Sequence, residues 1–329
     1  MVLALLLTAA MADARSRARR ASNHPAPVQH ETLVAADSIM AADGMVLLWP
    51  EGRMPNSRGI SVKDSIARHR VWQVSHPRMY AYMATHSEQT GTTVLVIPGG
   101  GYVKQAHETA GITVAKWLNG MGINAFVLLH RNPTSPDVVE STTAPTMDAQ
   151  RAVKWLRANA QSLGIDPHRL GVMGCSAGGH VSACVSAVTD DMARVGDGLD
   201  SVSCRPDFTI LISPVISMAD SIVHRGSKVA LLGSERMADA ALAERWSMER
   251  RVDASCPPAL LIHASNDTGV SAMNSVLYYQ ALLRNGVQRS SLHIFPFGKH
   301  SIAVRNQPGS TTLWPEIAEA WMREIGMLR

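Results

Sequence analysis

The chain has 329 residues, of which 46% are hydrophobic and 18% are charged, and its formal net charge is +4. This composition excludes a disordered chain, a collagen-like repeat and a small disulfide-dense protein. Four arginines and one aspartate between residues 13 and 20 account for +3 of the net charge. Because the remaining chain is nearly neutral, no nucleic-acid partner is expected.

Residues 1–40 are expected to form a leader ahead of the folded domain. Residues 1–12 are apolar over too short a span to cross a bilayer, which needs about 20 residues. They fit a signal peptide that ends in a small-x-small triplet, whereas the arginines just downstream argue against export. We therefore expect a secreted or periplasmic protein, with a cytoplasmic one as the alternative, and no stable membrane insertion.

Beyond the leader, buried-strand runs alternate with segments of helical periodicity. The predicted strands are 92–98, 123–129, 170–173, 208–212, 259–263 and 292–295, and the predicted helices are 108–119, 146–163, 178–188, 274–285 and 315–323. This alternation predicts an α/β fold with a mostly parallel sheet and helices on both faces. An interruption at about 215–255 is more typical of a lid over an active site than of a separate domain. Residues 41–329 are thus predicted to form one domain that carries this lid.

The cysteines show no zinc-binding spacing, and no metal or organic cofactor is expected. Cys204 and Cys256 each lie just before a predicted strand, at positions 208 and 259. Neighbouring parallel strands would bring these two entry points together. A disulfide between Cys204 and Cys256 is therefore a hypothesis, tied to export because oxidising compartments favour such bonds.

A candidate nucleophile follows the strand predicted at 170–173. Residues 174–178 are Gly-Cys-Ser-Ala-Gly and have the pattern G-x-S-x-G between a strand and a helix. That setting is the one a nucleophile elbow requires, in which the serine backbone is strained and its neighbours approach closely. Ser176 is predicted to be the nucleophile. Glycine is expected to be required at positions 174 and 178, because a Cβ there would clash.

The base and its orienting acid are expected in loops after later strands, in the order serine, acid, histidine. Asp267 follows the strand predicted at 259–263, and His300 follows the one at 292–295. We predict that His300 accepts the proton of Ser176 while Asp267 holds the other nitrogen of the ring. The plainer alternatives are a turn-forming aspartate and an exposed loop histidine.

An anionic tetrahedral intermediate needs preorganised N–H donors. The strand predicted at 92–98 runs into Pro98-Gly99-Gly100-Gly101-Tyr102, whose bare backbone N–H groups can turn into the site. We predict an oxyanion hole formed by Gly100, Gly101 and Ala177. The competing interpretation, a phosphate-binding loop, lacks the third glycine and the Gly-Lys-Ser/Thr sequence that it requires.

Together these segments resemble the α/β-hydrolase esterases related to acetylxylan esterases and bacterial feruloyl esterases. The shared motifs lie at 48–52, 98–102, 107–108, 148–152, 174–180, 205–208, 231–233 and 274–282. The family commonly has aspartate where this chain has Asn266, and glycine where it has Ser301. The resemblance implies a catalytic domain that hydrolyses short acyl esters, often acetyl groups on plant-wall polysaccharides such as xylan.

The predicted activity is therefore that of a serine carboxylesterase that acts on a small-molecule or polysaccharide ester by acyl transfer. A feruloyl esterase or a serine peptidase of the same fold is the alternative. A non-catalytic binding protein is disfavoured because it would have no reason to keep serine, acid and histidine in order. The sequence leaves the acyl group and the alcohol open, and says nothing of the oligomeric state.

Overall fold

The computed structural model describes residue 40, residues 42–300 and residues 302–329. The predicted signal peptide and basic segment lie outside the described residues, so both stay predictions. Ser301, next to the candidate base, is also outside them.

Within the described residues, eight strands form the central sheet. They are β1 (Gly44–Leu47), β4 (Arg78–Tyr82), β5 (Thr93–Ile97), β6 (Asn124–Leu129), β7 (Leu170–Cys175), β8 (Phe208–Ile212), β9 (Ala259–Ala264) and β10 (Ser291–Phe295). Their order is β1-β4-β6-β5-β7-β8-β9-β10. The six strands β5 to β10 are mutually parallel, whereas β4 pairs antiparallel with β6, and β1 pairs antiparallel with β4. This arrangement confirms the predicted α/β class and its mostly parallel sheet.

The two antiparallel strands were not predicted, because neither has a long apolar run. β4 carries Arg78 in a fully buried strand. The guanidinium of Arg78 is paired there with Asp64 at 2.5 Å and donates to the hydroxyl of Tyr80 at 2.7 Å. These partners offset the cost of burying the charge. A separate hairpin of β2 (Ser65–Ala67) and β3 (Arg70–Gln73) precedes β4.

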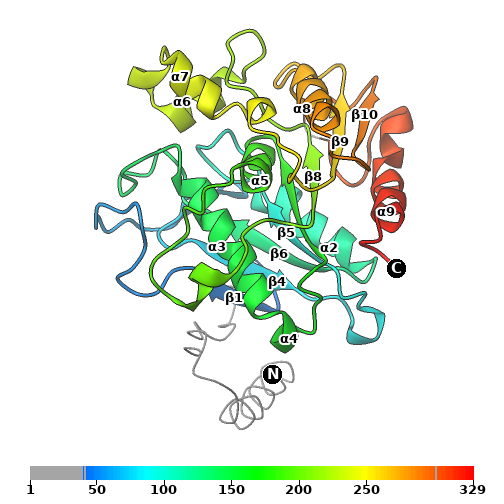
Figure 1. The fold of residues 1–329 in the computed structure, drawn as a ribbon, viewed down its shortest axis with the longest axis horizontal. Helices are drawn as coiled ribbons and strands as arrows, with labels where there is room; N and C mark the ends of the chain where they lie inside the picture. Colours follow the sequence, from blue (N-terminus) through cyan, green and yellow to red (C-terminus); the bar gives the residue numbers. More distant parts are fainter. Residues whose placement is uncertain (1–39, 41, 301) are drawn as a thin grey trace.

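Helices cover both faces of the sheet (Figure 1). The α-helices are α2 (Thr113–Asn119), α3 (Ala144–Ala158), α4 (Ala160–Leu163), α5 (Ala177–Ala187), α6 (Arg225–Leu232), α7 (Ala240–Arg245), α8 (Met273–Arg284) and α9 (Trp314–Glu324). Short helical turns are η1 (His86–Glu88), η2 (Glu108–Ile112), η3 (Gly198–Ser201), η4 (Ser234–Arg236), η5 (Met248–Arg250) and η6 (Gly309–Leu313). None of the helices in the described part of the chain is long and apolar enough to span a membrane.

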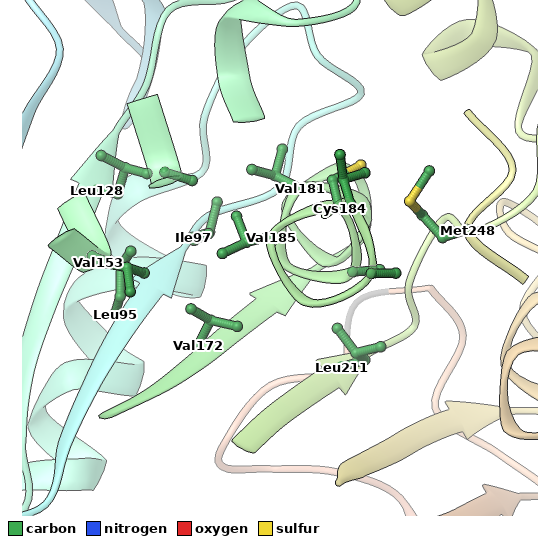
Figure 2. Close-up of a cluster of buried hydrophobic side chains, with 14 of the residues drawn as sticks. Leu95, Ile97, Leu128, Val153, Val172, Val181, Cys184, Val185, Leu211 and Met248 are labelled. Atoms are coloured by element: carbon green, nitrogen blue, oxygen red, sulfur yellow. The ribbon is translucent and has the colours of Figure 1, made fainter. Parts of the chain in front are cut away.

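Two apolar clusters hold these layers together. On one face, α3, α5 and α8 pack against the sheet through residues such as Val153, Val181 and Tyr278, and Figure 2 shows this cluster around α5. On the other face, α2 and α9 contribute Leu118 and Trp314. Apolar burial on both faces is what a parallel sheet with crossover helices needs.

The segment predicted as a lid folds into α6, η4, α7 and η5, and Figure 1 places α6 and α7 at the end of the molecule away from β1 and α4. A backbone hydrogen bond joins the two ends of this segment, in which the N–H of Met248 donates to the carbonyl oxygen of Ile216 at 3.1 Å. Trp246, which lies in this segment, is only 4% exposed and is part of the core. His224, which caps the start of α6, and Gly226 reach the cavity described below.

The hypothesis of a Cys204–Cys256 disulfide is wrong, since both residues are free thiols. β8 and β9 pair Thr209 with Ala259, so Cys204 lies five residues before its pairing position and Cys256 only three. In addition, the Sγ of Cys256 accepts a hydrogen bond from the N–H of Asp253 at 3.4 Å. The entry points of the two strands are neighbours, but the two cysteines are not in register.

Candidate active site

The turn between β7 and α5 has the strained geometry predicted for an elbow. Ser176 has φ 56° and ψ −122°, a conformation that non-glycine residues rarely adopt. A Cβ on Gly174 would lie 2.2 Å from the carbonyl oxygen of Gly178, and one on Gly178 would lie 2.0 Å from that of Ile97. Both glycines are therefore required by close approach, as predicted.

The structure brings Ser176, His300 and Asp267 together although they come from three separate loops. His300 Nε2 lies 2.9 Å from Ser176 Oγ, and His300 Nδ1 lies 2.7 Å from Asp267 Oδ2. The N–H of Lys299 donates to Asn266 Oδ1 at 2.9 Å and so ties the histidine loop to the acid loop. The three side chains form the hydrogen-bonded chain that nucleophile activation requires.

Asp267 is held ionised by more than its bond to His300. Burial of its carboxylate, whose side chain is 0% exposed, opposes ionisation, but hydrogen bonds from His263, His300 and the N–H of Val270 outweigh it and lower the pKa of Asp267 below its ordinary value. Its Oδ1 accepts from the N–H groups of Gly269 at 2.8 Å and Val270 at 2.9 Å. A permanent carboxylate is what stabilises a positively charged His300 during proton transfer.

His263 is a second histidine beside this carboxylate. Its Nε2 lies 3.0 Å from the carbonyl oxygen of Val270 and 3.3 Å from Asp267 Oδ2. Because both neighbours are acceptors, this nitrogen carries the proton, and Nδ1 accepts from the hydroxyl of Ser275 at 2.8 Å. His263 is therefore a packed core residue with its hydrogen bonds satisfied, and it also fixes the orientation of Asp267.

The predicted oxyanion donors lie next to the serine. Gly100 and Gly101 line the same cavity as Ser176 and have φ values of +154° and +65°, so their backbone path favours glycine. Ala177 is the first residue of α5, where an N–H has no acceptor within the helix. Ala177 itself is buried. Gly100 and Gly101 thus lie in the loop after β5 and Ala177 at the start of α5, so their N–H groups remain the candidates for an oxyanion hole.

A cavity of about 440 Å³ opens at Ser176 and His300. Its apolar wall consists of buried side chains from the face of the sheet that α2 and α9 cover, namely Val96, Val114, Met173, Ile212 and Trp314. Its more exposed side carries Arg70, Val103, Lys104 and His224. The volume lies within the range of about 300–1,000 Å³ that is typical of small-ligand sites.

His224 reaches the cavity from the start of α6. Its Nδ1 accepts from the N–H of Ser227 at 3.2 Å and lies 2.8 Å from the Ser227 hydroxyl, so the ring proton sits on Nε2. Burial, together with the nearby His300, lowers the pKa of His224. His224 is thus a neutral ring in the same cavity as Ser176 and His300.

His180, in the first turn of α5, is a packed core residue. Its Nε2 lies 2.8 Å from the carbonyl oxygen of Trp246, and its Nδ1 lies 2.6 Å from the hydroxyl of Tyr102. Burial lowers the pKa of His180 to about 4. The ring therefore stays neutral, donates to Trp246 and accepts from Tyr102.

Asp148 and Glu108, which belong to the motifs shared with the esterases, are paired with basic side chains. Asp148 is fully buried and pairs with Arg131 at 2.7 Å and with the indole N–H of Trp49 at 2.8 Å. Glu108 contacts His69 at 2.8 Å. Among the described residues, no group of three or more histidine, cysteine or acidic side chains could hold a metal ion.

Sequence reasoning missed the roles of His263 and His224. His263 precedes Asp267 by four residues across the end of a strand, a spacing that could have suggested contact. His224 carried no such signal, because its position depends on how the segment at 215–255 folds over the site.

Comparisons with known proteins identify the family of this chain. A protein-family model described as BD-FAE matches residues 79–282. An acetylxylan esterase from Xylanibacter ruminicola is 32% identical over 212 residues, which cover 64% of this chain and 41% of that protein. An endo-1,4-beta-xylanase B from Butyrivibrio fibrisolvens is 31% identical over 250 residues, covering 73% and 38%. The chain thus spans about two fifths of the length of these relatives.

A solved structure supports the same grouping. The acetyl ester-xyloside bifunctional hydrolase from Caldicellulosiruptor lactoaceticus is 35% identical, with a TM-score of 0.72, over 87% of this chain and 97% of that one. The similarity therefore extends over nearly the whole described domain.

Proposed function

Because this chain belongs to the BD-FAE family and has the α/β-hydrolase fold, we propose that it is a serine carboxylesterase that removes short acyl groups, in the first place acetyl groups, from a carbohydrate such as xylan. The observation that carries this proposal is the hydrogen-bonded chain from Ser176 through His300 to Asp267 at the cavity. The names of the two curated relatives and of the solved structure support acetyl esters and xylan as the substrate class.

The mechanism follows from the placement of these groups. Ser176 Oγ attacks the ester carbonyl carbon while His300 Nε2 takes its proton, and Asp267 stabilises the imidazolium that forms. The N–H groups of Gly100, Gly101 and Ala177 bind the oxyanion, each contributing roughly 3–4 kcal/mol to transition-state stabilisation. His300 then returns the proton to the leaving alcohol. Water, activated by the same histidine, hydrolyses the acyl-enzyme and releases the acid.

Feruloyl esters are a second candidate substrate class, and the cavity favours them. An acetyl group fills only a small part of a volume of about 440 Å³. The buried wall that includes Met173, Ile212 and Trp314 offers apolar contacts to a ring. Hydrolysis of methyl ferulate faster than of acetyl esters would make this the main activity.

The proposed substrate also bears on localisation. A polysaccharide cannot enter a cell, so we propose a secreted or periplasmic enzyme, with a cytoplasmic enzyme that acts on imported oligosaccharides as the alternative. Cell fractionation followed by an esterase assay distinguishes the two.

The proposal is tested by comparing wild-type protein with Ser176→Ala and with the control variant Ser201→Ala, whose exposed hydroxyl lies on η3. Wild type and the control should hydrolyse p-nitrophenyl acetate and release acetate from acetylated xylan, and Ser176→Ala should lose about a million-fold in kcat. Undiminished turnover by Ser176→Ala, with its folding intact, would overturn the assignment.

A further inference from the structure

The side chains that line the cavity are unevenly charged. Arg70, Lys104, His224 and His300 line it, while no aspartate or glutamate does among the residues that the structure describes. The chain as a whole is close to neutral apart from its N-terminal segment. The basic character of the cavity is therefore a local property of the site.

Arg70 and Lys104 have no carboxylate partner within the described part of the chain. One Nη of Arg70 donates to the carbonyl oxygen of the neighbouring His69 at 2.8 Å, and Lys104 Nζ lies 4.8 Å from the ring centroid of Trp72. Glu108, beside the cavity wall, is occupied by His69. Both cations line the cavity and are only partly exposed, so each can still accept an anion.

The backbone fixes these two cations relative to the oxyanion loop. Val71 and Gln105 exchange two backbone hydrogen bonds, of 3.0 and 2.7 Å, in an antiparallel bridge. Arg70 precedes Val71 on one segment of this bridge, and Lys104 precedes Gln105 on the other. The side-chain amide of Asn132 donates to the carbonyl of Trp72 at 2.8 Å. A site held in this way loses little conformational entropy when it binds a ligand.

We propose that Arg70 and Lys104 bind a carboxylate on the alcohol portion of the ester, so that the preferred substrate is an acetylated carbohydrate with an acidic sugar close to the acetylated one. This inference rests on the proposed esterase function. A polymer is too large for a cavity of about 440 Å³, so the alcohol portion lies across its partly exposed side, where both cations are. Guanidinium and ammonium groups are the side chains that best complement a carboxylate.

Trp72 adds a surface for the sugar itself. Its side chain is 39% exposed and lies against Lys104. This exposed indole offers apolar surface to a sugar ring, and the ammonium of Lys104 lies close to the same ring. The two interactions would act on the same end of the substrate.

The experiment compares kcat/KM for two acetylated xylo-oligosaccharides that differ only in whether a glucuronic acid side group is present. Wild type is measured beside Arg70→Gln, Lys104→Gln and a matched control, Lys116→Gln, which removes one exposed charge from α2 and does not line the cavity. Wild type and Lys116→Gln should prefer the acidic substrate. Each cavity variant should reduce that preference about fivefold, and about 1 M salt should reduce it in wild type because the Debye length falls to about 3 Å.

Equal kcat/KM for the two substrates in wild type would overturn this inference while leaving the esterase function intact. An equal loss of preference in Lys116→Gln would also overturn it, because the effect would then come from net charge alone. Hydrolysis of neither substrate by wild type would overturn the proposed function together with this inference. Thermal unfolding of each variant shows that the comparison is made on folded protein.

Discussion

Replacement of Asp267 by asparagine removes one charge and almost no volume, and the structure determines how the new amide must lie. Asp267 Oδ1 accepts from the N–H groups of Gly269 and Val270. The amide oxygen must keep that position, because an NH₂ group there would face two donors. The NH₂ group of Asp267→Asn is therefore directed at His300 Nδ1 and at the Nε2–H of His263.

The consequence is a change of tautomer in His300. In wild type, Nδ1 carries the proton and donates to Asp267 at 2.7 Å, which leaves Nε2 free to accept from Ser176. With an NH₂ group as neighbour, Nδ1 must become the acceptor and the proton moves to Nε2. His300 can then no longer take the proton of Ser176. A loss of kcat of about 10⁴-fold is expected, as for a triad with the wrong tautomer, equivalent to about 5 kcal/mol.

The assay is kcat/KM for p-nitrophenyl acetate, measured beside the control Asn266→Asp. Asn266 is exposed, and its Oδ1 accepts from the N–H of Lys299, a role that a carboxylate retains, so the control should stay close to wild type. Circular dichroism and thermal unfolding establish that both variants fold. If Asp267→Asn keeps activity within about tenfold of wild type, the tautomer argument is refuted.

Three further predictions concern stability. Gly178→Ala places a Cβ 2.0 Å from the carbonyl oxygen of Ile97, so chemical denaturation should show a loss of more than about 3 kcal/mol in the free energy of unfolding. Burial keeps His180 neutral in the folded protein to about pH 4 while the unfolded ring is protonated below 6.5; between these values wild type should lose stability as the pH falls, by about 1.4 kcal/mol per pH unit, and His180→Gln should show a shallower slope. The hydrogen bond from Arg236 lowers the pKa of Glu140 to about 2 from 4.5, so Glu140→Gln should cost at most about 1 kcal/mol, given a side chain 40% exposed. That difference should be full above pH 4.5 and vanish as the pH falls to about 2, and a difference that grows in acid would contradict it.

The strands and the elbow could be predicted from the sequence because their physical signals are local. β5 to β10 are short apolar runs bounded by turn residues, and the steric need for Gly174 and Gly178 follows from one turn. The bounds of the helices were less exact. The helix predicted at 146–163 is divided into α3 and α4 at Asn159. The side-chain amide of Asn159 donates a hydrogen bond to the carbonyl oxygen of Trp155 at 2.8 Å.

The parts that could not be predicted depend on contacts between distant segments. Arg78 can be buried in β4 because Asp64 and the hydroxyl of Tyr80 pair with it, and no periodicity reveals such partners. The disulfide hypothesis failed on a difference of two residues in register between Cys204 and Cys256. Arg70 and Lys104 line the same cavity because the bridge between Val71 and Gln105 brings their two chain segments together.

The ring of His180 joins three pieces of chain through hydrogen bonds. Tyr102 belongs to the loop after β5, His180 to α5, and Trp246 to the segment at 215–255. A different segment could be transplanted onto this domain only if it brought a carbonyl oxygen to the place of that of Trp246. Without that acceptor, a buried N–H would be left unsatisfied one turn from Ser176. The carbonyl oxygen of Trp246 is thus one constraint on exchanging this segment for another.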